Sequence, residues 1–166
     1  MSLAYAEILN GAPLARSAPG ARHEVICTRL HQWVRASVAD FPGTRLLPPR
    51  AEVRLASQHL VRPDLALLAA ATGKMWLAAE IVSSDDHQPD TVVKKQIYEE
   101  MRVPRLWMID PRYDNVEVYH CSQYGLILKS MLAGHELLTE KLLPEFQLTI
   151  SELFASPPPQ GSKPVR

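Results

Sequence analysis

The feature that most constrains this chain is a pair of apolar segments that each contain one carboxylate. Residues 60–68 read LVRPDLALL, residues 75–82 read MWLAAEIV, and the AATGK at residues 70–74 is typical of a turn. Asp64 and Glu80 therefore fall within two expected strands, where a buried carboxylate must be paired, protonated or bound to a metal ion. If the strands form a hairpin, both acids can project from one face near the same sheet edge.

The rest of the chain alternates expected helices and strands. The first 20 or so residues suggest a short strand or turn followed by a loop, and residues 41–50 (FPGTRLLPPR) form a proline-rich connector. Apolar positions at helical spacing predict a helix at residues 22–38. A second helix is expected at residues 89–101, because Pro89 suits a first turn and Asp85, Asp86 and Asp90 would meet the N-terminal end of its dipole. Further strands are expected at residues 52–55, 105–109, 116–121, 126–132, 134–143 and 146–150, followed by a short helix at residues 151–155.

This order of elements predicts an α/β (α+β) fold with a mixed central sheet flanked by helices. We expect a single domain at residues 1–155 and a disordered, proline-rich tail at residues 156–166. No apolar run approaches the roughly 20 residues of a membrane-spanning helix. The first residues carry no pattern of a signal peptide, so we expect a cytoplasmic protein with no membrane partner.

The charge of the chain is balanced overall but uneven along its length. The 18 basic and 18 acidic residues give a net charge of zero, so the total does not indicate nucleic-acid binding. Residues 1–63 hold eight arginines and four acids, whereas residues 64–100 hold three lysines and seven acids. A basic half beside acids that hold a cation would suit an anionic polymer such as DNA, although solvated surface charge explains the same counts.

Asp64 and Glu80 suggest a site for Mg²⁺ or Mn²⁺. Two carboxylates, together with phosphate oxygens and water, complete the octahedral shell that Mg²⁺ prefers at ~2.1 Å. The following helix adds a possible cation, because Lys94 is four residues after Asp90 and four before Tyr98. Lys94 could neutralise charge on a reacting phosphate. Alternatively, it forms an exposed pair with Asp90 while Tyr98 packs in the core.

Several ordered motifs resemble a large bacterial family of restriction-endonuclease-like proteins, the Uma-two (Uma2) family, which has the PD-(D/E)xK nuclease fold. The segments EILNG, VRPDLALL and LAAEIVSS resemble the family's N-terminal strand and its two acidic strands. His23 stands where the family has a histidine in its first helix. The D-x-x-x-K-x-x-x-Y pattern starting at Asp90, the later MRVPRLWMIDP and VEVYH, and the closing LLPEFQLTISELF are also similar. Together these motifs cover residues 6–154.

The resemblance implies that Asp64 and Glu80 are metal ligands and that Lys94 is the catalytic lysine. In the wider fold this lysine usually stands two residues after the glutamate, but Val82 occupies that position here. Other departures from the family pattern are Asn10, Ala12, Met101 and Ser84-Asp85.

Three further residues are secondary candidates for the site. Glu7 could add a carboxylate from the N-terminal strand or cap a turn. His23 could orient a water molecule or a phosphate, or it could be structural. Glu24 could be the first-helix acid that some nucleases of this fold use.

The sequence thus predicts a Mg²⁺- or Mn²⁺-dependent endonuclease that hydrolyses DNA at Asp64, Glu80 and Lys94. A homodimer is plausible because two symmetric sites would cut both strands of a duplex. The alternative is a nuclease-like fold that does not cut and serves as a nucleic-acid-binding or protein-interaction module. Its zero net charge and the displaced lysine favour this second interpretation.

Overall fold

A six-stranded mixed sheet forms the centre of the computed structural model, which describes residues 3–83 and 85–157. The strand order is β10-β9-β8-β7-β6-β3, and only β7 and β8 run parallel. The strands are β3 (Thr44–Leu46), β6 (Leu65–Ala69), β7 (Met75–Ile81), β8 (Arg105–Asp110), β9 (Asn115–Ser122) and β10 (Gly125–Ala133). The expected hairpin of the two acidic segments is confirmed, because β6 and β7 are antiparallel neighbours.

A helical crossover joins β7 to β8, as a parallel strand pair requires. It begins as a π-helix, η1 (Pro89–Lys94), and continues as α2 (Lys95–Glu100). The sequence predicted one helix over residues 89–101, so the helix is confirmed and its π-helical first half is new. Short π-helical segments occur frequently at functional sites.

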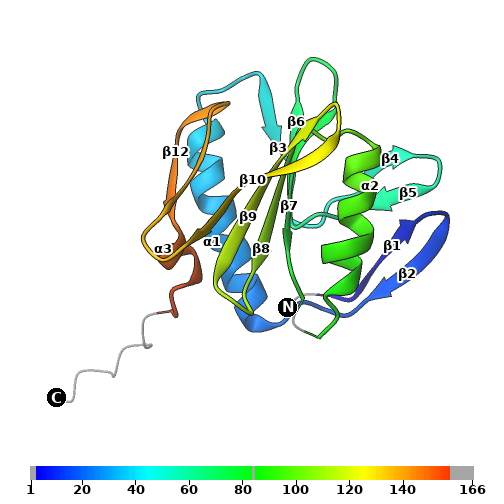
Figure 1. Cartoon of the computed structure of the whole chain (residues 1–166), viewed down its shortest axis with the longest axis horizontal. Coiled ribbons are helices and arrows are strands. Elements are labelled where there is room, and N and C mark those ends of the chain that lie inside the picture. Colours follow the sequence, from blue (N-terminus) through cyan, green and yellow to red (C-terminus); the bar gives the residue numbers. More distant parts are fainter. Residues whose placement is uncertain (1–2, 84, 158–166) are drawn as a thin grey trace.

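The two long helical segments lie on opposite faces of the central sheet (Figure 1). One core cluster joins Leu65 and Leu67 of β6 to Leu30 of α1 (Ala21–Val38). The second cluster joins Ala66 of β6 to Ile97 of α2. Side chains alternate along a strand, so each face of β6 serves one cluster.

Two smaller sheets complete the fold. The first has the order β2-β1-β5-β4, from β1 (Tyr5–Leu9), β2 (Ala12–Arg16), β4 (Val53–Ala56) and β5 (His59–Val61). Asn10 and Gly11 connect β1 to β2 with φ values of 53° and 78°, as a tight two-residue hairpin turn requires. The second pairs β11 (Leu137–Glu140) with β12 (Leu143–Thr149), followed by α3 (Ile150–Phe154). β12 and α3 pack on the α1 side of the central sheet.

The structure corrects four expectations about the elements. The expected strand at residues 60–68 is two strands, β5 and β6, in different sheets, because Pro63 cannot donate a ladder hydrogen bond. The expected N-terminal loop contains β2, and the expected connector contains β3. The described strands form two smaller sheets besides the mixed central sheet, whereas the sequence predicted only the central one. Most of the predicted disordered tail, residues 158–166, lies outside the described residues.

Candidate active site

Asp64 lies in the break between β5 and β6, and only 3% of its surface is exposed. Its Oδ1 accepts hydrogen bonds from His23 Nε2 at 2.8 Å and from Arg50 Nη1 at 3.1 Å. Its Oδ2 accepts a hydrogen bond from the backbone N–H of Ile81 at 2.8 Å. Because Ile81 directly follows Glu80 in β7, this bond places the two predicted acids next to each other.

Helix α1 holds Asp64 from one face. His23, Cys27 and His31 are four residues apart and therefore share that face. His31 Nε2 is 2.7 Å from the backbone oxygen of Asp64, and Cys27 Sγ is 3.7 Å from the same atom. Burial lowers the pKa of His31, so the ring is neutral and its Nε2–H donates to that oxygen. The helix therefore contacts both the side chain and the backbone of Asp64.

Glu80 is equally buried, with 2% of its surface exposed, and its partners come from the helical crossover. Its Oε1 is 2.6 Å from Lys94 Nζ and accepts a hydrogen bond from the hydroxyl group of Tyr98. Lys94 ends η1 and Tyr98 lies one turn later in α2. Lys94 and Tyr98 therefore lie on one helix face, as predicted. This face is turned toward Glu80 and the sheet.

The N-terminal hairpin adds Glu7 to this cluster. Glu7 Oε2 is 2.8 Å from Lys94 Nζ and accepts a hydrogen bond from the backbone N–H of Arg62 at 2.8 Å. Glu7 Oε1 accepts a hydrogen bond from Arg16 Nη1 at 2.8 Å. Glu7 stands opposite Leu14 in the β1–β2 register, so Arg16 is its diagonal neighbour on the same face.

Arg16 continues the network to η1. Its two terminal nitrogens hold both oxygens of Asp90 at 3.0–3.1 Å. Asp90 Oδ2 also accepts a hydrogen bond from the backbone N–H of Ser83 at 3.3 Å. The buried network thus joins three carboxylates (Glu7, Glu80 and Asp90) to two cations (Arg16 and Lys94). One negative charge remains for a proton or an added cation to balance.

The pKa values of the buried groups follow from this balance. Burial raises the pKa of Glu80 to about 8 against the opposing effect of Lys94, and the nearby acids Asp90 and Glu7 act in the same direction as burial. Burial disfavours the charged form of Lys94, but Glu80 and Glu7 more than compensate and raise its pKa above the ordinary value. Burial opposes ionisation of Asp64 as well, yet its contacts with His23 and Ile81 lower its pKa. Asp64 and Lys94 are therefore charged, and Glu80 can carry a proton near neutral pH.

The structure brings all six predicted site residues into one connected region. Asp64, Glu80, Lys94, Glu7 and His23 are linked by the contacts above. Glu24 joins them indirectly, since its carboxylate is 2.8 Å from Arg50, which in turn contacts Asp64.

Val82 occupies the position where the wider fold usually has its lysine. It is 2% exposed, belongs to the apolar cluster on the α2 side and also lines the cleft described below. Lys94 instead reaches Glu80 from the crossover that covers this face of the sheet. Glu80 therefore contacts a lysine, but this lysine belongs to η1 and not to the segment that directly follows Glu80.

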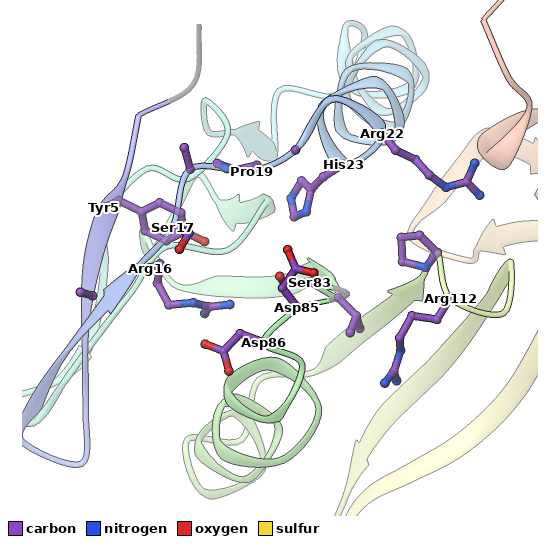
Figure 2. Close-up of a pocket in the computed structure, with 15 residues that line it drawn as sticks. Tyr5, Arg16, Ser17, Pro19, Arg22, His23, Ser83, Asp85, Asp86 and Arg112 are labelled. Atoms are coloured by element: carbon purple, nitrogen blue, oxygen red, sulfur yellow. The ribbon is translucent and has the colours of Figure 1, made fainter.

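A cleft of about 260 Å³ opens beside this network, between the start of α1, the end of β2 and the segment that follows β7. Figure 2 shows Arg16 and His23 reaching into it from β2 and α1. The other charged lining residues are Arg22, Arg112, Asp85 and Asp86. Because His23 also contacts Asp64, the cleft wall is directly connected to the buried acids.

Three residues of the site were not singled out in the sequence: Arg16, Arg50 and His31. Arg16 could have been found through the Asn-Gly hairpin turn, which fixes the register of β1 and β2. His31 is spaced at i+8 from His23, which places it on the same helix face. Arg50 has no local signal, because its position depends on how the connector folds back toward Pro63.

The donor set fits a Mg²⁺ site of the kind that substrate completes. Asp64 and Glu80 offer hard carboxylate oxygens, and Mg²⁺ is usually bound through one or two carboxylates plus water and substrate phosphates. Among the described residues, no group of three or more His, Cys, Asp or Glu side chains has the geometry of a metal cage. The residues therefore fit a shared metal site better than a closed structural one.

Together, the fold and the cluster of buried acids define a nuclease-like protein. The sequence profile of the Uma2 family, described as "Putative restriction endonuclease", matches residues 3–151. The chain therefore belongs to the Uma2 family, as the motifs predicted. No curated protein shows a significant match.

A solved structure has the same fold. It is a "putative nuclease belonging to DUF820" from Anabaena variabilis ATCC 29413, with a TM-score of 0.75 and 18% sequence identity. The similarity covers 90% of this chain and 89% of that one. The mixed α/β architecture is thus confirmed, and family and fold together support a nuclease function.

Within residues 3–83 and 85–157, no helix is both long enough and apolar enough to cross a membrane.

Proposed function

We propose that this protein is a metal-dependent endonuclease that hydrolyses DNA phosphodiester bonds at a site formed by Asp64, Glu80 and Lys94. The observation that carries this proposal is the hydrogen bond from the N–H of Ile81 to Asp64, which sets Asp64 beside Glu80. Mg²⁺ or Mn²⁺ bound there would polarise the phosphodiester and lower the pKa of a coordinated water molecule. The chain's own residues supply the ligands, their orientation and the surrounding charge.

The two acids are anchored in the same way. Among the described residues, Asp64 Oδ1 has two donors, His23 and Arg50, whereas Oδ2 has one, the N–H of Ile81. Glu80 Oε1 is likewise contacted by Lys94 and Tyr98, and no described residue donates a hydrogen bond to Oε2. A carboxylate oxygen has about two acceptor sites. One oxygen of each acid therefore holds the side chain in place and the other keeps acceptor capacity for a ligand.

Lys94 acts in this proposal through its position beside Glu80. Its side chain is only 1% exposed, so its charge is felt through a medium of low dielectric constant. It holds Glu80 and Glu7 in fixed orientations and contributes positive potential where negative charge develops on the phosphate.

His23 connects the acids to the cleft, where it would orient a water molecule or a phosphate oxygen. Arg16, Arg22 and Arg112 line the same cleft and provide positive charge for a phosphodiester backbone. Cutting both strands of a duplex is simplest with two symmetric sites, so we propose a homodimer in the cytoplasm.

Plasmid cleavage tests the proposal. Wild-type protein should cut supercoiled DNA in Mg²⁺ or Mn²⁺, whereas Asp64→Asn, Glu80→Gln and Lys94→Met should each lose cleavage. The exposed residues Glu145 and Lys141 supply matched controls, because Glu145→Gln and Lys141→Met should cut normally. Circular dichroism must show that each variant is folded. Cleavage by the wild type that persists in excess EDTA would contradict the metal requirement.

A second candidate function is a nuclease-like binding module that does not cut. Two observations favour it: Lys94 is almost inaccessible and paired with two carboxylates, and Val82 replaces the usual lysine. Fluorescence anisotropy with labelled DNA separates the two functions. Salt-dependent binding without turnover in Mg²⁺, Mn²⁺ or Ca²⁺ would support the binding module.

A further inference from the structure

Arg50 joins three distant segments of the chain at the proposed site. Its Nη1 donates to Asp64 Oδ1 at 3.1 Å, and its Nη2 donates to Glu24 Oε2 at 3.0 Å. Glu24 lies in α1, Arg50 follows β3, and Asp64 precedes β6. The guanidinium side chain is 16% exposed, so most of this bridge is shielded from water.

The backbone of Arg50 is held as firmly as its side chain. Its N–H donates to the oxygen of Pro63 at 3.0 Å, and its own oxygen accepts a hydrogen bond from Arg62 Nη1 at 3.2 Å. These contacts attach Arg50 to the two residues that precede Asp64. The position of the guanidinium is thereby fixed relative to the Asp64 backbone.

Arg50 also adopts a conformation that a side-chain-bearing residue rarely takes, with φ at 57°. Such left-handed backbone is strained for a residue with a side chain and persists only where the surroundings enforce it; it clusters at functional sites. An arginine is suited to this place because its planar fork can hold two carboxylates at once, which a lysine cannot do with the same geometry.

We propose that Arg50 is a positioning residue for Asp64, and that Glu24 acts through Arg50 instead of binding the metal ion itself. The inference rests on the proposed function, since it concerns the orientation of a metal-binding carboxylate. Arg50 and His23 occupy both acceptor sites of Oδ1, so the carboxylate plane is set and Oδ2 is the oxygen available for the ion. Glu24 in turn fixes the other half of the guanidinium fork.

Two opposing effects of Arg50 can be separated by experiment. Its positive charge repels a bound cation, so loss of that charge alone would tighten metal binding. Its hydrogen bonds hold the ligand in place, and loss of such outer contacts typically costs about 10- to 100-fold in metal affinity or activity. Arg50→Lys keeps the charge and loses the fork, whereas Arg50→Gln loses both.

The test is a calorimetric titration of each variant with Mn²⁺, combined with cleavage kinetics on plasmid DNA. We expect Arg50→Gln and Arg50→Lys to bind Mn²⁺ roughly 10- to 100-fold more weakly. Cleavage should lose kcat to a similar degree, while KM for DNA stays within about twofold, because Arg50 does not line the cleft. Arg54→Gln is the matched control, since Arg54 is exposed in the neighbouring strand β4 and should leave both values unchanged.

A double variant tests the role of Glu24. If Glu24 acts through Arg50, then Glu24→Gln combined with Arg50→Lys should bind Mn²⁺ within about twofold of Arg50→Lys alone. If instead the Mn²⁺-binding losses of Glu24→Gln and Arg50→Lys multiply fully in the double variant, Glu24 acts independently of Arg50, and this part of the proposal is overturned. This comparison also serves if Arg50→Gln does not fold.

The remaining outcomes separate the inference from the proposed function. Unchanged or tighter Mn²⁺ binding by Arg50→Gln, with normal binding by the wild type, overturns the positioning role alone. If the wild type binds Mn²⁺ but cuts no DNA, and both variants bind Mn²⁺ more weakly, the positioning role is supported and the nuclease function is overturned. Absence of Mn²⁺ binding by the wild type overturns both.

Discussion

Lys94 Nζ and Glu80 Oε1 lie 2.6 Å apart, and neither side chain has more than 2% of its surface exposed. A buried charge is stabilised mainly by its ion-pair partner, because no water is available to solvate it. The pair also joins the crossover to β7, so it stabilises the same arrangement that the proposed chemistry requires. Stability and function are therefore coupled at this contact.

Removal of the lysine should destabilise the fold. Lys94→Met leaves Glu80 and Glu7 without their shared cation, and loss of one partner from a buried pair costs about 3–5 kcal/mol. Urea denaturation should show this loss in the free energy of unfolding. Lys141→Met, an exposed control, should change it by less than about 0.5 kcal/mol. Equal stability of the two variants would show that Lys94 is not needed to balance the acids.

Glu80 should make the stability of the metal-free protein fall as the pH rises from about 4.5 to about 8. Glu80 has its pKa raised from the ordinary value of 4.5 to about 8, so within this range the folded state holds a proton that the unfolded state has lost. Stability decreases with pH wherever the folded state binds more protons. The contribution is fully present below pH 4.5 and is lost as the pH passes 8.

The Glu80→Gln variant isolates this contribution, since glutamine does not titrate. Urea denaturation in EDTA at several pH values should give a shallower decrease for the variant, with a difference of about 1.4 kcal/mol per unit of pKa shift at most. Parallel curves for the two proteins would mean that Glu80 keeps an ordinary pKa.

Most of the central sheet could be predicted because its strands carry long apolar runs or clear alternation. The pairing of β6 with β7 followed from a single turn between them, and the crossover helix followed from Pro89 and the acids at its N-terminal end. The strands β3 and β5, which the sequence did not predict correctly, lacked such signals. β3 has only three residues and lies between prolines. β5 ends at Val61 and β6 begins at Leu65, so the gap between them is short and Pro63 is the main sign of the change of sheet.

The candidate site was predictable in part for the same reason. Asp64 and Glu80 stand out because each is an acid in an apolar strand. The partners of these acids do not stand out, since Arg16 and Arg50 are ordinary arginines until the chain folds. The contacts of Arg50 with Asp64 and of Arg16 with Asp90 join residues 14 and 74 positions apart, and no local pattern encodes them.

A lysine restored to the usual position should compensate for loss of Lys94. Val82 packs against apolar neighbours but also lines the cleft, so a long side chain there can extend its charged end into the cleft. We expect Val82→Lys with Lys94→Met to cut plasmid DNA measurably faster than Lys94→Met alone. Val82→Arg in the same background is the comparison for a cation of different shape. Cleavage no better than that of Lys94→Met would show that the charge must act from the helix.

Arg22 should contribute to DNA binding through its charge. It lines the cleft, half of its side chain is exposed, and its present partner is the exposed Asp114. Arg22→Gln should weaken binding to all DNA sequences and reduce the slope of log affinity against log salt by about 1. Arg45→Gln, on the exposed side of the edge strand β3, should keep the wild-type slope. Fluorescence anisotropy at several salt concentrations measures both, and an unchanged slope for Arg22→Gln would place the DNA elsewhere.

His31 should be needed to hold the backbone of Asp64, although it does not contact the cleft. His31→Phe removes the donor to the Asp64 oxygen and leaves a buried acceptor with only the weak donor Cys27, which costs about 1–3 kcal/mol. The freed backbone should also lower kcat more than it changes KM for DNA. His31→Gln retains an N–H donor of similar reach and should recover part of both losses. Urea denaturation and cleavage kinetics on the same samples check this, and full stability of His31→Phe would show that the hydrogen bond contributes nothing to the position of Asp64.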